Sequence, residues 1–236
     1  MTGRKAGLHE HSRNILLFGA NGQLGTKLNT LLATKGTVRA IGHADLDLRD
    51  LATLRTFMHE TNPALIVNAA AYTAVDAAES DAGNAQLVNA EAPRVMAEVA
   101  REHKALLVHY STDYVFDGTA HTPYTEESPV SPLGVYGASK LAGERAVAES
   151  GAAHLILRTA WLYSNRGKNF LNTILRLAGE RDELRVVNDQ SGCPTYADLV
   201  ADASVRMLDG MFASGDVRPE RCGLYHIACQ GETTWW

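Results

Sequence analysis

The stretch that decides the fold reads NILLFGANGQLG over residues 14–25. It begins with a short apolar run, which is the pattern of a β-strand buried on both faces. Three glycines follow at three-residue spacing: Gly19, Gly22 and Gly25. Leucines at helical spacing then predict a helix over residues 26–34. A strand, a glycine turn and a helix in this order predict a variant dinucleotide-binding turn, where a pyrophosphate approaches the amides at the helix start. A plain tight turn between strand and helix is the alternative.

Composition narrows the class of protein. The chain has 236 residues with an apolar share of 45%, enough for a sizeable core. Its net charge of -5 gives no reason to expect nucleic acid or a membrane as a partner. No window approaches the roughly 18 apolar residues of a membrane span. The three cysteines are too few and too scattered for a disulfide framework or a zinc site, so we expect no metal and a cytoplasmic protein.

Strand-like and helix-like stretches alternate along the chain. We expect strands at residues 14–18, 37–41, 64–68, 105–110, 154–158, 184–187 and 223–227. We expect helices at residues 26–34, 51–60, 86–103, 169–179 and 197–208, and one around residues 135–144. This alternation predicts an α/β fold with a doubly wound, Rossmann-like parallel sheet. Residues 76–83 are expected to form a surface turn, and residues 233–234 resemble the start of a helix.

The same pattern suggests three parts of the chain. Residues 1–13 are polar and are expected to form a flexible N-terminal extension. Residues 14–160 are expected to form the dinucleotide-binding domain. Residues 161–236 are expected to form a small, incomplete C-terminal substrate-binding portion.

Tyr136 and Lys140 are the first candidates for chemistry. Residues four apart face the same side of a helix, so the phenol and the ammonium can address one point. A free tyrosine has a pKa of about 10 and exchanges protons poorly near pH 7. A neighbouring lysine cation favours the phenolate and brings the group closer to its working range. The pair suits proton transfer to or from a substrate oxygen, although Tyr-x-x-x-Lys also occurs on ordinary helix surfaces.

The ends of two predicted strands carry further candidates. The fourth strand leads into STDYVFDG at residues 111–118, and ligands of parallel sheets lie beyond such ends. Thr112 there can hydrogen-bond the substrate oxygen that a tyrosine protonates. At the end of the second strand, where an acid would hold the adenosine ribose, stand Gly42 and His43, with no carboxylate. This predicts that NADPH is accepted at least as well as NADH.

In combination these features resemble the extended short-chain dehydrogenase/reductases, and within them the dTDP-4-dehydrorhamnose reductases. The resemblance runs from about Asn14 to the last residue. Five stretches carry it: residues 18–25, 67–76, 111–118, 158–161 and 188–195. It implies reduction of the C4 keto group of dTDP-4-dehydro-6-deoxy-L-mannose to dTDP-L-rhamnose. This is the last step of dTDP-rhamnose biosynthesis, which serves cell-surface polysaccharides. It implies NADPH as cofactor, with NADH as an alternative, and a small nucleotide-sugar partner.

The resemblance also implies roles for individual residues. Tyr136 would donate the proton to the sugar C4 oxygen, Lys140 would lower its pKa and hold the nicotinamide ribose, and Thr112 would share the substrate oxygen. The expected substrate contacts are Thr112, Asp113, Tyr136 and Trp161, with burial in the core as the alternative for Trp161. The expected cofactor contacts are Gly19, Asn21, Gly22, Gln23, Leu24, Gly25, Asp47, Leu48, Ala71, Tyr72, Thr73, Tyr110 and Lys140.

The chain departs from the family pattern in two ways. Gly42 stands where such reductases often have an acid that favours NADH. The chain also ends several tens of residues before such reductases usually do, so we expect it to bind cofactor but to turn over substrate poorly. The usual homodimer contacts would belong to a full-length form.

Two other functions remain as alternatives. A sugar-nucleotide dehydratase or epimerase shares the fold and the Tyr/Lys pair, but dehydratases have a glutamate base where this chain has Tyr114. The non-catalytic, NADP-binding regulatory subunit of methionine adenosyltransferase carries a stretch similar to residues 111–118.

Overall fold

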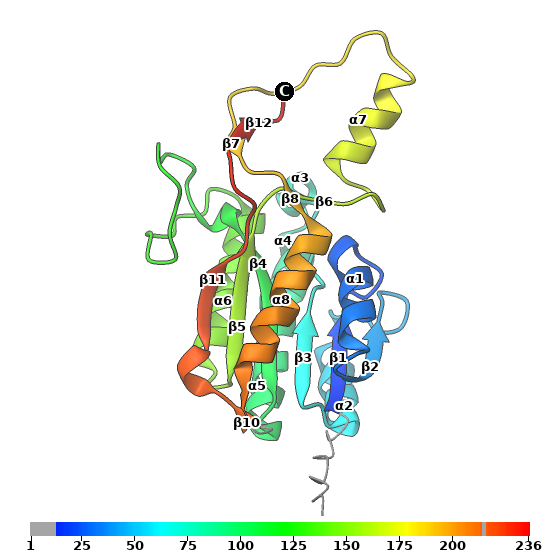
Figure 1. The fold of residues 1–236 in the computed structure, drawn as a ribbon, viewed down its shortest axis with the longest axis vertical. Coiled ribbons are helices and arrows are strands. Elements are labelled where there is room, and N and C mark those ends of the chain that lie inside the picture. The colour runs from blue at the N-terminus through cyan, green and yellow to red at the C-terminus, as the bar shows by residue number, and fades with distance from the viewer. Residues whose placement is uncertain (1–12, 214–215) are drawn as a thin grey trace, which may run out of the picture.

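The structure is a computed structural model that describes residues 13–213 and 216–236 (Figure 1). Apart from Arg13, the expected N-terminal extension lies outside the described residues. Six parallel strands form the central sheet in the order β11-β5-β4-β3-β1-β2. Their bounds are β1 (Arg13–Phe18), β2 (Gly36–Ile41), β3 (Leu65–Asn68), β4 (Leu106–Thr112), β5 (His154–Thr159) and β11 (Gly223–His226). The predicted doubly wound α/β fold is confirmed.

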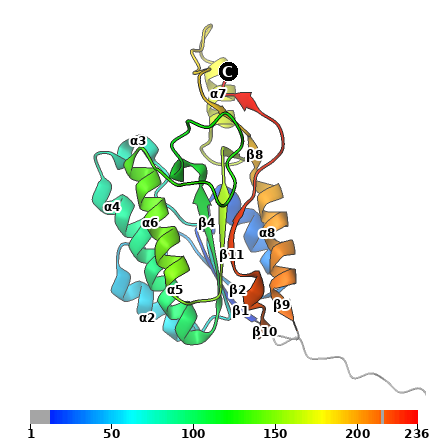
Figure 2. The same ribbon diagram turned by 90° about the vertical axis from the view of Figure 1, so that its left-hand side faces the viewer.

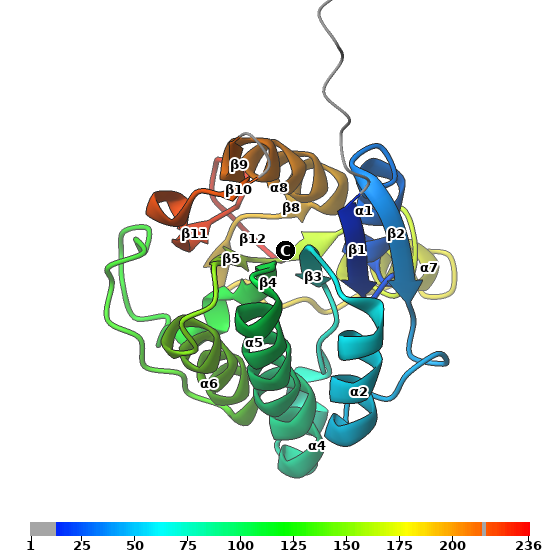
Figure 3. The same ribbon diagram turned by 90° about the horizontal axis from the view of Figure 1, so that it is seen from below.

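Helices cover both faces of the sheet (Figures 2 and 3). One face carries α1 (Gln23–Leu32) and α8 (Ala197–Met211), which pack against each other. The other face carries α2 (Leu51–Thr61), α5 (Ala92–His103) and α6 (Val135–Glu149). The apolar run of β1 serves both layers, since Leu16 and Phe18 face the second layer while Ile15 and Leu17 face the first. Burial on both faces explains why this strand is continuously apolar.

The shorter elements complete the chain. They are α3 (Val75–Ala78), α4 (Ala82–Gln86), the π-helical turn Leu87–Glu91, the 3-10 turns Asp113–Val115 and Pro219–Arg221, β6 (Leu162–Tyr163), α7 (Phe170–Ala178), β7 (Ser191–Gly192), β8 (Thr195–Tyr196), β9 (Phe212–Ala213), β10 (Asp216–Val217) and β12 (Thr233–Thr234). Of these, β6, α7, β7, β8 and β12 lie beyond the carboxyl ends of the central strands (Figure 1). The sheet therefore places the C-terminal portion over the edge where ligands of such folds bind.

The central layers use residues from both sides of the expected division at residue 160. Strand β11 pairs with β5, and α8 packs on α1. The stretch between β5 and α8 stands above the sheet together with the last residues (Figure 1).

Three local expectations were wrong. Residues 76–83 include most of α3 and the start of α4, with a turn between them, and are not a turn throughout. Residues 184–187 form no strand. Residues 233–234 pair antiparallel with β7 and do not start a helix. The helix expected over residues 86–103 is present. A π-helical turn over Leu87–Glu91 precedes Pro93, whose missing N–H suits the restart at α5.

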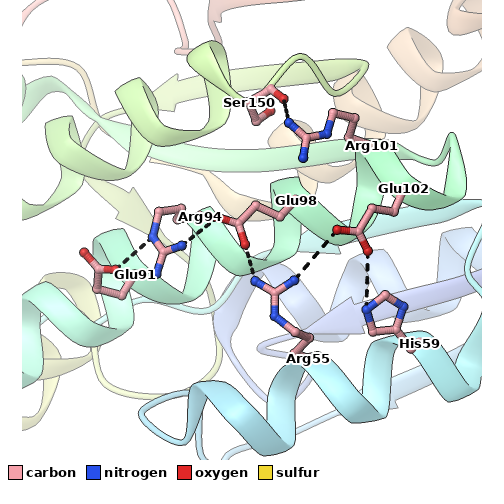
Figure 4. A network of polar contacts seen from close by, with 8 residues as sticks. All are labelled: Arg55, His59, Glu91, Arg94, Glu98, Arg101, Glu102 and Ser150. Carbon is pink, nitrogen blue, oxygen red and sulfur yellow. Dashed lines mark hydrogen bonds and ion pairs between the residues drawn. The ribbon is translucent and has the colours of Figure 1, made fainter.

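A chain of ion pairs fastens α2 to α5 on the surface (Figure 4). Arg55 pairs with Glu98, and His59 lies 3.4 Å from Glu102. Arg94 pairs with Glu98 at 2.6 Å along the same helix. Exposed pairs of this kind each contribute about 1 kcal/mol or less, so the two helices are held mainly by the apolar cluster beneath them. None of the described helices has the length and apolar character needed to cross a bilayer.

Candidate active site

The glycine turn between β1 and α1 is closely packed against its neighbours. Gly19 has φ +75°, and a Cβ there would lie 2.6 Å from the backbone of Ala69 and Ala70. A Cβ at Gly25 would lie 2.0 Å from the carbonyl oxygen of Gly19. Glycine is therefore required at both positions, because any side chain would push the turn away from β3 or from α1.

The start of α1 suits an anion. Gly22 is the N-cap, it provides no side-chain cap, and the first turn has no acidic residue. The first amide groups of the helix therefore lack a side-chain acceptor, and these groups favour negative charge. The side chain of Leu24 is buried in the core, so this residue can offer only its amide. The turn thus fits the pyrophosphate of a dinucleotide.

Gln23 joins this turn to the C-terminal portion. Its Oε1 accepts hydrogen bonds from the Ser164 hydroxyl at 3.0 Å and from the Asn169 amide at 2.9 Å. Asn169 also caps α7 by accepting the Asn172 N–H at 2.9 Å. The cofactor turn and α7 are therefore coupled through one side chain.

The end of β2 does carry a carboxylate, and the expectation of none there was wrong. The Gly42 N–H donates to Asp45 Oδ2 at 2.7 Å, and the Asp45 N–H returns a bond to the Gly42 carbonyl at 3.1 Å. This turn brings Asp45 back to the strand end. A Cβ at position 42 would lie 2.3 Å from Nδ2 of Asn21, so Asn21 and Asp45 occupy the space of a residue-42 side chain.

Asp47 and Leu48 follow on the next segment. Asp47 holds the Arg49 guanidinium through both carboxylate oxygens, at 2.9 Å and 2.6 Å, and also accepts the Arg49 N–H. These hydrogen bonds lower the pKa of Asp47 to about 2, so it is ionised near neutral pH. Leu48 is buried in the core, which leaves only its backbone for a cofactor.

The loop after β3 is held by a residue that sequence reasoning missed. Asn89, in the π-helical turn, accepts the Tyr72 N–H at 2.8 Å and donates to the Tyr72 carbonyl at 3.0 Å. Its amide also donates to the Ser139 hydroxyl at 3.0 Å. A Cβ at Gly143 would lie 2.1 Å from the Asn89 carbonyl, so α6 packs closely on this turn. Asn89 thus connects the loop of residues 71–73 with the helix that bears Lys140.

Thr112 and Tyr136 come together as the sequence predicted. The Thr112 hydroxyl donates to Asp113 Oδ1 at 3.0 Å and lies beside the Tyr136 hydroxyl. The Tyr114 ring packs edge-on against Tyr136, with the ring centroids 5.5 Å apart. Burial raises the pKa of Tyr136 to about 12, and Thr112 opposes this only in part. The lowered pKa expected from Lys140 was therefore wrong for the chain alone, and Tyr136 keeps its proton near neutral pH.

Lys140 is buried behind Tyr136. Its Nζ donates to the Tyr110 carbonyl at 2.7 Å and lies 3.5 Å from His109 Nε2. Burial lowers the pKa of Lys140 to about 8, and Glu144 raises it. The Tyr110 hydroxyl donates to Ser204 in α8 at 2.7 Å, so only the Tyr110 backbone faces the site.

A buried ion pair fixes α6 on the sheet. Arg158 of β5 donates to both carboxylate oxygens of Glu144, at 2.8 Å and 2.6 Å. The guanidinium also lies over the Phe116 ring, 5.0 Å from its centroid. Sequence reasoning missed this pair, because its partners are fourteen positions apart with no shared pattern.

Trp161 lies in the C-terminal portion and not in the main core. Its backbone has φ +43°, uncommon for a residue with a side chain. Its ring stacks on Trp235, with centroids 3.7 Å apart, and a Cβ at Gly192 would lie 2.5 Å from the ring. The Phe170 ring lies 4.5 Å from that of Trp235. An aromatic surface therefore stands above the sheet.

Comparison with known proteins gives consistent matches. Residues 13–236 match the RmlD substrate binding domain. The chain is 48% identical to a dTDP-4-dehydrorhamnose reductase of Burkholderia thailandensis over 221 residues, covering 94% of this chain and 74% of that protein. It is 45% identical to the dTDP-4-dehydrorhamnose reductase of Escherichia coli, and the match covers 94% of this chain and 75% of that protein.

Solved structures match as well. A dTDP-4-dehydrorhamnose reductase of Clostridium acetobutylicum superposes with TM-score 0.86 at 38% identity, covering 94% of this chain and 76% of that one. The dTDP-4-dehydrorhamnose reductase of Bacillus anthracis, in complex with NADP, superposes with TM-score 0.86 at 35% identity. The match covers 95% of this chain and 77% of that one. The chain thus spans about three quarters of the length of these relatives.

Proposed function

The chain belongs to the dTDP-4-dehydrorhamnose reductases, and from this premise we propose that it reduces the C4 keto group of dTDP-4-dehydro-6-deoxy-L-mannose to give dTDP-L-rhamnose. The product completes the biosynthesis of dTDP-rhamnose. The cofactor is NADPH, with NADH as an alternative, consistent with the relative that binds NADP. The comparisons support this activity and not a regulatory subunit.

One observation carries the proposal: Tyr136 stands beside Thr112, at the carboxyl edge of a sheet whose first turn fits a pyrophosphate. When bound, NADPH supplies the hydride for the sugar carbon. The residues of the chain supply the rest. Tyr136 keeps its proton near neutral pH because of burial, so it can donate it to the C4 oxygen. Thr112 donates to the same oxygen when its hydroxyl turns from Asp113 to the sugar.

Simple reduction needs no further base, and the site fits that requirement. A dehydratase would need a carboxylate at position 114 to remove a proton from the sugar ring. Tyr114 stands there instead, with 43% of its surface exposed. The nearest carboxylate, Asp113, is hydrogen-bonded to Thr112, and burial raises its pKa. We assign Asp113 and Trp161 to the substrate, Asp113 beside the sugar and Trp161 as part of the aromatic surface above it.

The cofactor contacts divide by the group that each residue can offer. Backbone amides serve at the glycine turn, at Leu48 and in the loop after β3. The Lys140 ammonium serves at the nicotinamide ribose. The proposed set is Gly19, Asn21, Gly22, Gln23, Leu24, Gly25, Asp47, Leu48, Ala71, Tyr72, Thr73, Tyr110 and Lys140.

The setting follows from the chemistry. A reductase that consumes NADPH and a dTDP-sugar belongs in the cytoplasm, where its product serves cell-surface polysaccharides. Its partner is the small nucleotide sugar, without nucleic acid or membrane, and the enzyme assembles as a homodimer. The three cysteines of the chain are unpaired thiols, consistent with a reducing compartment.

The test is an assay of NADPH oxidation with dTDP-4-dehydro-6-deoxy-L-mannose, followed by identification of the product. Substrate-dependent oxidation that yields dTDP-L-rhamnose is expected. A matched dTDP-sugar that has a hydroxyl at C4 serves as the control and should leave NADPH unchanged. Failure to oxidise NADPH with the keto sugar, at any substrate concentration, would refute the proposed function.

A further inference from the structure

Three polar side chains meet inside the sheet, behind Tyr136. Asn68 and His109 are register partners on β3 and β4, and Lys140 reaches them from α6. All three side chains are almost fully buried. Buried polar groups are costly unless they are hydrogen-bonded, so the direction of each bond in this row carries information.

The backbone fixes the orientation of Asn68. The Ala70 N–H donates to Asn68 Oδ1 at 3.2 Å, which leaves the Nδ2 group of Asn68 facing His109. That Nδ2 group can only donate, and it lies 3.1 Å from His109 Nδ1. Nδ1 of His109 must therefore accept. Burial lowers the pKa of His109 well below its usual range, so the ring is neutral and its single proton sits on Nε2.

The Nε2 proton points towards Lys140. The distance from Nε2 to Lys140 Nζ is 3.5 Å, and Nζ already donates to the Tyr110 carbonyl. An ammonium has three donors and no acceptor, whereas an amine has one lone pair. An N–H aimed at Nζ therefore favours the amine form of Lys140.

The other groups that bear on Lys140 act differently. On α6, Glu144 favours the cation but is itself held by Arg158. Tyr136 precedes Lys140 by one turn and is protonated near neutral pH. From β4 come only His109 and the uncharged Tyr110. Among these neighbours, His109 is the one whose N–H disfavours the ammonium form of Lys140.

We infer that His109, oriented by Asn68, is a positioning residue that presents an N–H to Lys140 and so sets the pH at which Lys140 loses its proton. In the proposed reduction, the pH at which Lys140 loses its proton is the upper end of the pH range in which the enzyme works. This consequence for activity rests on the proposed function. The hydrogen-bond direction is a property of the chain alone.

Asn68→Asp should reverse the direction of the hydrogen bonds that run from residue 68 through His109 to Lys140, with little change in side-chain shape. A carboxylate has no donor, so His109 must place its proton on Nδ1, and Nε2 then accepts from the Lys140 ammonium. Ala70 N–H keeps its acceptor. The alkaline limb of the kcat profile should move to higher pH, because Nε2 then accepts from the ammonium instead of presenting a proton to it. Asn14→Asp, which adds the same charge at the far end of β1, should leave the limb in place. A limb that stays at the wild-type pH in Asn68→Asp would overturn the inference.

A second measurement needs neither activity nor a variant. In ¹⁵N NMR of the wild-type chain, His109 should show a protonated Nε2 and an unprotonated Nδ1. The opposite tautomer would overturn the inference, even if Asn68→Asp failed to fold. If the chain lacked reductase activity while His109 showed the expected tautomer, the proposed function would fail and the inference would stand.

Discussion

At the scale of single residues, the site works through side chains whose environment sets their protonation. Tyr136 and Lys140 are neighbours in sequence, yet burial moves their pKa values in opposite directions, up for the phenol and down for the ammonium. Desolvation always disfavours the charged form, so both groups are pushed towards neutrality. Tyr136 therefore holds a proton that it can give near neutral pH.

Asp45 offers a test of cofactor choice at the same scale. Its carboxylate lies at the end of β2, hydrogen-bonded to the Gly42 N–H. An acid there repels a 2′-phosphate, so Asp45→Asn should raise the ratio of kcat/KM for NADPH over NADH. The expected change is up to about fivefold, since charges 4 Å apart in water interact by about 1 kcal/mol. Asp50→Asn, at the cap of α2, is the matched control. A ratio that is the same in Asp45→Asn and wild type would exclude Asp45 from cofactor choice.

At the scale of elements, α6 depends on one buried ion pair. Arg158→Met leaves the Glu144 carboxylate buried without its partner, which should cost about 3 to 5 kcal/mol in the free energy of unfolding. Replacing both residues, with Glu144→Leu added, should recover most of the loss because no charge remains buried. Urea unfolding of the two single variants and the double variant measures this.

The surface pair Arg94–Glu98 serves as the comparison for the variants of Glu144 and Arg158. It has similar geometry but is more exposed, and its removal should cost about 1 kcal/mol or less. If the double variant Glu144→Leu/Arg158→Met were as unstable as Arg158→Met alone, uncompensated charge would not be the reason.

Elements could be predicted from sequence where their pattern is long enough. The apolar run of β1 and the periodic helices α2 and α8 were found within a few residues. The helices α3 and α4 have only four and five residues, too short for a helical period to show. Strand β12 exists because Thr233 and Thr234 meet β7, and nothing local specifies that partner.

Site residues divide in the same way. Thr112, Tyr136 and Lys140 could be predicted because strand ends and helical spacing are visible in sequence. Asp45, Asn89 and His109 could not. Asp45 reaches its place through a turn, Asn89 through the packing of α6 on a π-helical turn, and His109 through the register of β3 with β4. Register is a property of the assembled sheet, so no single stretch contains it.

At the scale of the whole molecule, the cofactor turn and the C-terminal portion share Gln23. Asn169→Asp keeps the α7 cap, because Oδ1 still accepts the Asn172 N–H, but removes the donor to Gln23. The C-terminal portion should then be placed less accurately over the site. Misplacement of about an ångström can cost roughly 10²-fold in rate. The expected result is a lower kcat/KM for the nucleotide sugar with unchanged NADPH affinity, measured by steady-state kinetics and titration. Asn172→Asp is the control, and equal kcat/KM in Asn169→Asp and wild type would contradict the coupling.

The central claim is that Tyr136 donates the proton in reduction of the keto sugar, and one comparison tests it most directly. Tyr136→Phe and Tyr114→Phe each remove one hydroxyl and keep the packed ring pair. Turnover with NADPH and dTDP-4-dehydro-6-deoxy-L-mannose should fall by about 10² to 10⁴-fold in Tyr136→Phe, the usual contribution of general acid catalysis. Tyr114→Phe should stay close to wild type. Wild-type turnover by Tyr136→Phe would contradict the account.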